Sequence, residues 1–189
     1  MNDSQKRFFK KSNIFKFLLI APVLISIPFL KNDKVFAGLE FQWDQDTGYR
    51  RLKWFQRDSE KRARNTIFFF LRPSDRKASL IKITLKIPKT FKSTLKQEKI
   101  SFCQVKIGGF ESRTKCIEDI PADIELNEDN TSLDIFPYKP IPNNKNSYAI
   151  VFKVFNPKRT GLYQFHSYGQ YFGKDPVSRY LGSATIVID

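Results

Sequence analysis

The sequence ISFCQVKIGGFESRTKCI, residues 100–117, contains two short strand-like runs on either side of Gly108 and Gly109. Each run carries one of the two cysteines of the chain. Glycines between two such runs are typical of a tight β-hairpin connection. We therefore predict a hairpin closed by a disulfide between Cys103 and Cys116, with the two cysteines opposite one another and the centre of the hairpin just after Gly109. A bridge over a loop of this length is expected to stabilise the fold by about 3 kcal/mol.

The pairing of the cysteines depends on the compartment, because disulfides persist mainly in oxidising compartments. Residues 1–37 have the parts of a secretory signal: a basic start, the apolar run FLLIAPVLISIPFL at residues 17–30, and small residues before Gly38. We expect cleavage before Gly38, which leaves residues 38–189 as a single domain. The alternative is a retained membrane anchor, but the apolar run is short for a hydrocarbon core about 30 Å thick.

Residues 38–189 contain a series of short strands separated by turn signals. Residues 81–87 alternate strictly, which predicts the apolar side chains from Ile81 to Ile87 on one buried face. Residues 147–155 are nearly apolar on both faces, as expected of a central strand. The other runs are residues 66–72, 100–107, 113–117, 123–126, 131–138, 161–168 and 180–188, with an early strand within 41–64 and one helical turn within 89–99. This series predicts an all-β protein, a β-sandwich of immunoglobulin-like type.

The chain is strongly basic, with a formal net charge of +14. Such a charge favours association with anionic surfaces, whether nucleic acid, membrane head groups or acidic envelope polymers. Basic and aromatic side chains are interleaved in residues 41–64, and we take Arg50, Arg51 and Lys53 as candidate contacts to an anionic envelope polymer. An exported protein rarely meets nucleic acid, so we expect none as a partner. The alternative is a solvated charged face whose tryptophans lie in the core.

A second candidate surface lies near the C-terminus, where aromatic residues are frequent. Residues 169–179, GQYFGKDPVSR, would form a loop that presents Tyr171 and Phe172 to a sugar or to a partner protein. Strand alternation places Tyr163 and Phe165, a few residues earlier, in the core instead. This surface would make the chain a carbohydrate-binding or partner-binding domain.

Residues suited to catalysis or metal binding are scarce. His166 is the single histidine, so a Ser-His-Asp or Cys-His arrangement would have to use it, and Asp175 or Ser178 could in principle be brought near it. The sequence has no Gly-x-Ser-x-Gly nucleophile motif, and we interpret His166 as an ordinary strand residue. One histidine and two bridged cysteines cannot form a tetrahedral zinc or copper site. We expect no catalytic residue, no metal and no cofactor, with an unrecognised hydrolase as the enzymatic alternative.

Three motifs together indicate a family: Cys-x-x-x-x-Gly-Gly at residues 103–109, Asn-Pro followed by Gly-x-Tyr-x-Phe at 156–165, and Tyr-Leu-Gly at 180–182. With them, the region from about Tyr49 to the C-terminus resembles the domain of unknown function 2808 family, which is found in cyanobacteria. The resemblance implies an exported, β-rich protein with no established activity and no catalytic residues to carry over.

These observations together predict an exported, non-catalytic binding or structural module associated with the cell envelope. The expected location is the periplasm or the envelope, with the thylakoid lumen as the alternative. The expected partner is an anionic envelope polymer or an envelope protein. No transmembrane segment is expected after removal of the signal peptide.

Overall fold

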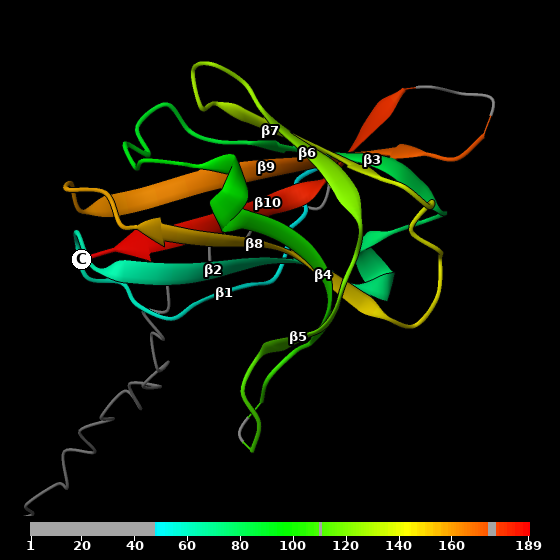
Figure 1. Cartoon of the computed structure of the whole chain (residues 1–189), viewed down its shortest axis with the longest axis horizontal. Coiled ribbons are helices and arrows are strands. Elements are labelled where there is room, and N and C mark those ends of the chain that lie inside the picture. The colour runs from blue at the N-terminus through cyan, green and yellow to red at the C-terminus, as the bar shows by residue number, and fades with distance from the viewer. Residues whose placement is uncertain (1–47, 110, 174–176) are drawn as a thin grey trace, which may run out of the picture. The chain divides into compact units, whose positions relative to one another are not determined.

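The computed structural model describes residues 48–109, 111–173 and 177–189, which form two antiparallel β-sheets (Figure 1). The first sheet has the strand order β1-β2-β8-β4-β5, and the second has the order β10-β9-β3-β7-β6. The strands are β1 (Trp54–Gln56), β2 (Arg64–Leu71), β3 (Leu80–Lys86), β4 (Ile100–Lys106), β5 (Lys115–Asp119), β6 (Ala122–Leu126), β7 (Ser132–Pro137), β8 (Ser147–Phe155), β9 (Gly161–Tyr171) and β10 (Ser178–Ile188).

Helical structure in the described residues consists of two short 3-10 helices, η2 (Pro73–Asp75) and η3 (Gln97–Lys99). The helix η3 lies inside the segment that was predicted to contain one helical turn. Within the part of the chain that the structure describes, no helix has the length and apolar composition needed to cross a membrane.

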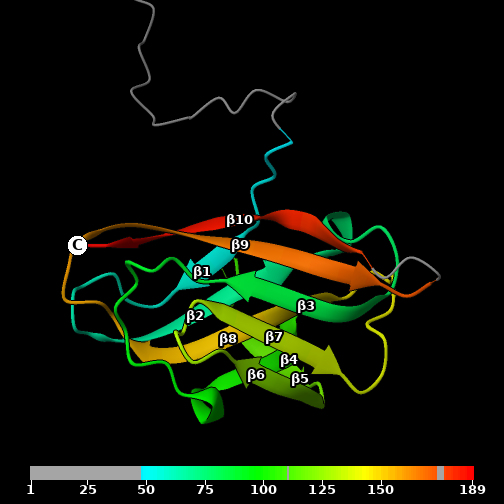
Figure 2. The ribbon, with the colours of Figure 1, turned by 90° about the horizontal axis from the view of Figure 1, so that it is seen from above.

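The two sheets pack face to face (Figure 2). The ring centroids of Phe69 on β2 and Phe165 on β9 lie 4.8 Å apart across the interface between the sheets. Phe69 also meets Phe152 on β8 edge to face, with centroids 5.3 Å apart. All three rings are at most 1% exposed. The fold is therefore a β-sandwich of immunoglobulin-like type, which confirms the prediction from the strand series.

The strand β8 lies between β2 and β4 in the middle of the first sheet, as its apolar pattern predicts. Ile150 and Phe152 face the second sheet and belong to the main core. Ala149 and Val151 point to the opposite face and are also buried, because they belong to a second apolar cluster on that outer face. The middle of the first sheet is thus covered on both sides.

The start of β3 differs from the predicted alternation. Leu80 pairs with Tyr171 and Lys82 pairs with Gln170, so Ile81 is the extra residue of a β-bulge. The bulge turns Leu80 into the core, where it is fully buried, and leaves Ile81 only half-buried. The prediction that the buried face begins at Ile81 was therefore wrong by one residue.

On one side of the sandwich the chain passes from the second sheet to the first. The backbone N–H of Ser183 on β10 donates to the Arg50 carbonyl at 2.7 Å, and the N–H of Leu52 donates to the Ser183 carbonyl at 2.8 Å. The Lys53 carbonyl then accepts the N–H of Phe70 on β2 at 3.1 Å. This short segment therefore pairs with the outer edge of β10 before it enters β1.

The hairpin formed by β4 and β5 contains the predicted disulfide, with the Cα atoms of Cys103 and Cys116 5.7 Å apart. Its register differs from the prediction, because Cys116 pairs with Val105 and Cys103 pairs with Asp119. A β-bulge at Ile117 produces this offset. The bridge therefore joins two diagonal positions on one face of the ladder, and the prediction of directly opposed cysteines was wrong.

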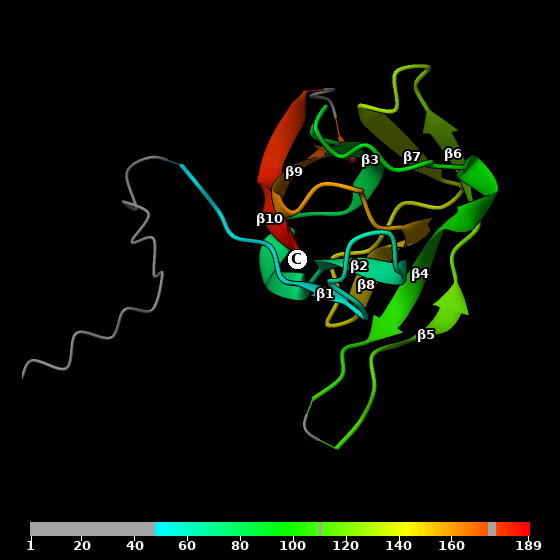
Figure 3. The same ribbon diagram turned by 90° about the vertical axis from the view of Figure 1, so that its left-hand side faces the viewer.

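The connection between β4 and β5, residues 107–114, is longer than the predicted tight turn and extends away from the sandwich (Figure 3). The backbone N–H of Gly109 donates to the Ser112 carbonyl at 2.9 Å, and the N–H of Gly108 donates to the Thr114 hydroxyl at 3.0 Å. A Cβ atom on Gly108 would lie 2.5 Å from the Thr114 nitrogen. Glycine is needed here because the two arms of the connection approach closely, not because the turn is short.

Candidate ligand-binding surface

A row of outward-facing side chains follows the segment that crosses from β10 into β1. Strand alternation buries Leu52, which is 2% exposed, and packs Trp54 against the core. The residues that alternate with these two along the segment are exposed. We call these four residues the basic ridge: Arg51, Lys53, Phe55 and Arg57. In the described part of the chain the ion pairs are Arg72 with Asp75 and Lys82 with Asp134, so the ridge cations have no acidic partner.

Arg50 does not belong to this ridge, although the sequence groups it with Arg51 and Lys53. Its guanidinium donates a hydrogen bond to the Ser74 carbonyl at 3.1 Å, and its own carbonyl accepts the Ser183 N–H. The structure therefore brings Arg51 and Lys53 together on one surface and ties Arg50 to the connection after β2.

The far end of the ridge is held by two buried asparagines. The Asn65 side-chain oxygen accepts the Arg57 N–H at 3.0 Å, and its amide nitrogen donates to the Asn156 side-chain oxygen at 2.9 Å. The Asn156 amide in turn donates to the Glu60 carbonyl at 2.7 Å. Asn65 is 1% exposed and Asn156 is 4% exposed. These bonds fix the backbone at Arg57 to β2 and to the end of β8.

A cavity of ≈ 510 Å³ lies between the basic ridge and the connection of the β4–β5 hairpin, and we call it the hairpin cavity. Phe55 and Arg57 of the ridge line one side. The hairpin lines the other side with Gly108, Gly109, Ser112, Arg113 and Thr114. Two arginines from distant parts of the sequence thus share one cavity. The sequence offers no signal for this meeting, because it depends on how the connection between β4 and β5 is placed relative to the basic ridge.

The second apolar cluster lies on that outer face. It consists of Phe68, Phe70, Cys103, Val105, Ala149 and Val151, each at most 4% exposed. Ile107 and Cys116 of the hairpin pack against it. Apolar contact therefore holds the base of the connection on this face, while the disulfide joins the two strands of the hairpin to each other.

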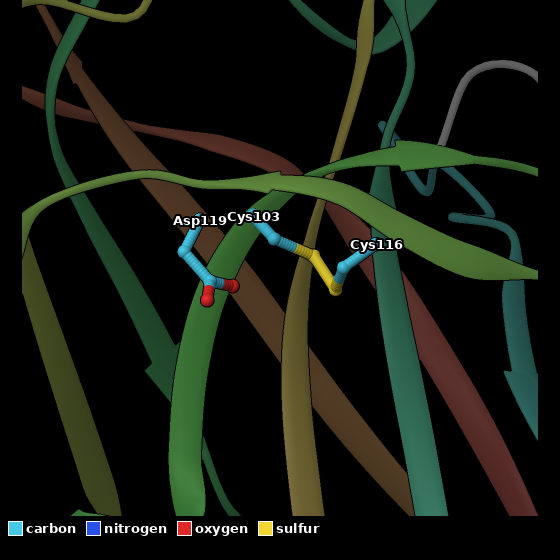
Figure 4. A group of neighbouring side chains, drawn as sticks. All are labelled: Cys103, Cys116 and Asp119. Atoms are coloured by element: carbon cyan, nitrogen blue, oxygen red, sulfur yellow. A yellow bond between two sulfur atoms is a disulfide. The ribbon is translucent and has the colours of Figure 1, made fainter.

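Figure 4 shows the disulfide beside the carboxylate of Asp119. One ligand atom from each of Cys103, Cys116 and Asp119 lies within 4.8 Å of the others. Zinc and other soft metals bind cysteine as the thiolate, and bridged sulfur atoms offer none. This group therefore acts as a covalent link between β4 and β5 rather than as a metal centre while the bridge is intact.

The two aromatic residues predicted at the C-terminal loop have different environments. Tyr171 ends β9, is half-buried, and its hydroxyl accepts the Lys77 N–H at 3.4 Å. Phe172 is 69% exposed. Both line a smaller cavity of ≈ 230 Å³, which we call the aromatic cavity, together with Lys77, Ala78, Gly173, Val177 and Arg179. Asp175 lies outside the described residues.

His166 contacts Ser183, whereas the sequence suggested Ser178 as its partner. Its Nδ1 lies 2.6 Å from the Ser183 hydroxyl oxygen, which also shares a hydrogen bond with the Tyr180 hydroxyl. Burial raises the pKa of Tyr180. Ser183 is 0% exposed, and none of the described carboxylates is hydrogen-bonded to His166. A substrate has no access to this hydroxyl, so the cluster satisfies buried polar groups rather than forming a nucleophile.

Arg76 is a further buried cation, only 3% exposed. Its guanidinium donates to the Leu71 carbonyl at 2.7 Å and to the Asn146 carbonyl at 2.9 Å, and it lies 4.8 Å from the centre of the Tyr148 ring. Burial lowers its pKa. These contacts connect the segments after β2 and before β8, so Arg76 is a structural residue and not a ligand contact.

The two five-stranded sheets, with an edge segment shared between them and a disulfide-bonded hairpin at the edge of the first sheet, define an immunoglobulin-like β-sandwich. The chain belongs to the family described as protein of unknown function (DUF2808), which matches residues 43–188. This confirms the resemblance drawn from the three motifs. No curated protein matches the chain in sequence.

Several solved structures are similar to this chain in fold. The bacterial hydrophobin BslA has 12% sequence identity and a TM-score of 0.46, over 75% of this chain and 95% of that chain. The collagen-binding domain from a Staphylococcus aureus adhesin has 14% identity and a TM-score of 0.40, over 71% of this chain and 95% of that chain. A Nocardia farcinica protein described as having an immunoglobulin-like fold has 8% identity and a TM-score of 0.39, over 73% of this chain and 97% of that chain.

Proposed function

We propose that the chain is an exported, non-catalytic module of the cell envelope that binds anionic envelope polymers through the basic ridge. The observation that carries this proposal is the outward alignment of Arg51, Lys53 and Arg57 without an acidic partner in the described residues. The signal-like sequence of residues 1–37 and the disulfide support a location outside the cytosol.

The ridge suits a polymer better than a small ion. Side chains at every second residue of a strand are spaced by about 7 Å, so the ridge presents a row of charges rather than a single point. Exposed charges are screened over about 8 Å at physiological ionic strength. Binding through the ridge should therefore be electrostatic, tolerant of the detailed structure of the polymer, and sensitive to salt.

We expect the double substitution Arg51→Glu with Lys53→Glu to weaken binding to polygalacturonate, an acidic polysaccharide, by at least about tenfold, because two attractive contacts become repulsive. The measurement is retention of the mature protein on immobilised polygalacturonate at low salt and at physiological salt. Wild-type retention should fall steeply as salt rises.

The matched control is Lys139→Glu with Lys145→Glu, which makes the same change of charge at two exposed positions between β7 and β8. This control should retain binding close to that of the wild type. An equal loss in both double variants would show that net charge alone governs binding and would contradict a ridge. Salt-insensitive binding that is lost in Phe172→Ala would point to the aromatic cavity instead.

The aromatic cavity supports a second candidate function, a carbohydrate-binding or partner-binding domain. Its basis is the 69% exposure of Phe172 beside the half-buried Tyr171. An exposed aromatic ring next to a ring with a polar tip is a suitable surface for a sugar. The smaller volume and the single fully exposed ring make it the weaker of the two candidates.

A further inference from the structure

We propose that the hairpin cavity binds one anionic sugar unit, a hexose that carries a carboxylate or a sulfate. This inference rests on the proposed function and gives it a ligand class. The basic ridge would contact a polymer along its length, whereas the hairpin cavity would hold a single charged unit of it.

Two cations meet at the hairpin cavity from separate elements. Arg57 lines it from the ridge and Arg113 lines it from the hairpin. Both side chains are exposed, and neither forms an ion pair with a described acid. A guanidinium presents a planar fork of donors that matches a carboxylate or a sulfate better than a point charge does. The pair therefore favours a compact anion between the two walls.

The other lining groups fit the neutral part of a sugar. The Thr114 hydroxyl accepts the Gly108 N–H at 3.0 Å, so its own proton remains available as a donor, and the Ser112 hydroxyl lines the same wall. Phe55 lines the cavity and is 39% exposed, so it can supply an aromatic contact to the C–H face of a hexose. An aromatic face with a few hydroxyl and charged groups is typical of small-ligand sites.

The hairpin wall is fixed before any ligand arrives. The disulfide joins β4 to β5, and Ile107 packs on the second apolar cluster at the base of the connection. A preformed wall reduces the ordering cost that a ligand must overcome. The volume of ≈ 510 Å³ also lies in the range of small-ligand sites, about 300 to 1,000 Å³.

A membrane surface is a less suitable ligand for this cavity than a sugar. Binding to lipid head groups normally combines cations with apolar side chains that enter the bilayer. Several large apolar side chains in the described residues are more than half exposed, but none of them lines the hairpin cavity: Ile117, Tyr138, Phe155, Leu162, Phe172 and Val177. Phe55 is the one aromatic ring among the described residues that line the hairpin cavity.

The test is calorimetric titration of the mature protein with digalacturonate, a sulfated disaccharide, and neutral lactose. We expect at least one charged probe to bind and lactose not to bind, and the tighter of the two charged probes identifies the anionic group. Arg113→Gln should weaken that binding at least about tenfold, because a charge-assisted bidentate contact is lost. Lys115→Gln makes the same change of charge on the same hairpin, outside the cavity lining, and should keep the affinity.

Failure of both charged probes to bind the wild type would overturn the proposal, as would equal losses in Arg113→Gln and Lys115→Gln with near-ultraviolet circular dichroism unchanged. Arg113-dependent binding to phosphatidylglycerol vesicles, without competition from the sugars, would assign the cavity to lipid and overturn it too. The basic ridge is judged separately. Salt-dependent retention on polygalacturonate without disaccharide binding contradicts only the proposal for the hairpin cavity. Disaccharide binding without salt-dependent retention contradicts only the proposal for the basic ridge.

Discussion

Gly182 lies where the segment that enters β1 crosses β10. Its φ angle is +149°, and a Cβ atom there would lie 2.7 Å from the Arg50 carbonyl oxygen and 2.8 Å from Cγ of Leu52. A larger residue would push the crossing segment away from β10. The glycine of the Tyr-Leu-Gly motif therefore has a structural reason, which is to let the basic ridge lie close against the sandwich.

Asn156 likewise gives the Asn-Pro motif a structural role, and a substitution of this residue tests that role. We expect Asn156→Ala to lower the free energy of unfolding by about 2 to 3 kcal/mol, because it leaves the Asn65 amide and the Glu60 carbonyl without their buried partner. Urea denaturation measures the change. Because Asn65 also holds the backbone of Arg57, binding to polygalacturonate should weaken as well.

The control for this substitution is Asn143→Ala. Asn143 donates one exposed hydrogen bond to the Lys77 carbonyl, and its loss should cost under about 1 kcal/mol. Similar costs in the two variants would contradict the structural role assigned to the buried pair.

At the scale of elements, the disulfide-bonded hairpin stabilises the fold and forms one wall of the hairpin cavity. Replacing Cys103 and Cys116 together with alanine should lower the free energy of unfolding by about 2 to 4 kcal/mol, chiefly by relaxing a constraint on the unfolded chain. The measurement is urea denaturation of the double variant beside the wild type.

Reduction of the wild type should reproduce the loss caused by the double substitution, while the reductant should not affect the double variant. An unchanged midpoint of urea unfolding, both after reduction and in the double variant, would show that the disulfide does not stabilise the fold. The substitution should also weaken the binding of the charged disaccharide, since Arg113 depends on the hairpin for its position.

Most strands follow from local pattern, which is why their approximate bounds and the central position of β8 were predictable. The register of the strand pairs was not predictable, because a β-bulge adds one residue to a strand and the apolar alternation of the sequence gives no sign of it. Ile81 and Ile117 are both such extra residues. The diagonal disulfide is the direct result of the second bulge.

At the scale of the whole molecule, the candidate site brings together segments that the sequence separates. Arg51 and Lys53 were predictable as a pair because a strand places alternate side chains on one side. Arg113 was not, because the position of the connection depends on tertiary contacts of Ile107 and Cys116 with the second apolar cluster. The two halves of the hairpin cavity therefore have no common signal in the sequence.

The proposed export concerns the whole chain, and it has a direct test. The intact mass of the protein from its native cells should correspond to a chain that begins at Gly38 and should be lighter than the reduced form by one pair of hydrogen atoms. Alkylation should modify Cys103 and Cys116 only after reduction. A full-length mass with freely alkylated cysteines would contradict both the signal peptide and the oxidising compartment.

The segment that crosses onto β10 has one more consequence. It occupies the hydrogen-bonding groups of Ser183 in the middle of an edge strand, and an open edge is where one sheet can recruit a strand from another molecule. A strand from another molecule therefore cannot pair with β10 at this position, which limits self-association through this edge. The backbone of Arg50 and Leu52, on either side of the ridge residue Arg51, thus covers this part of the β10 edge.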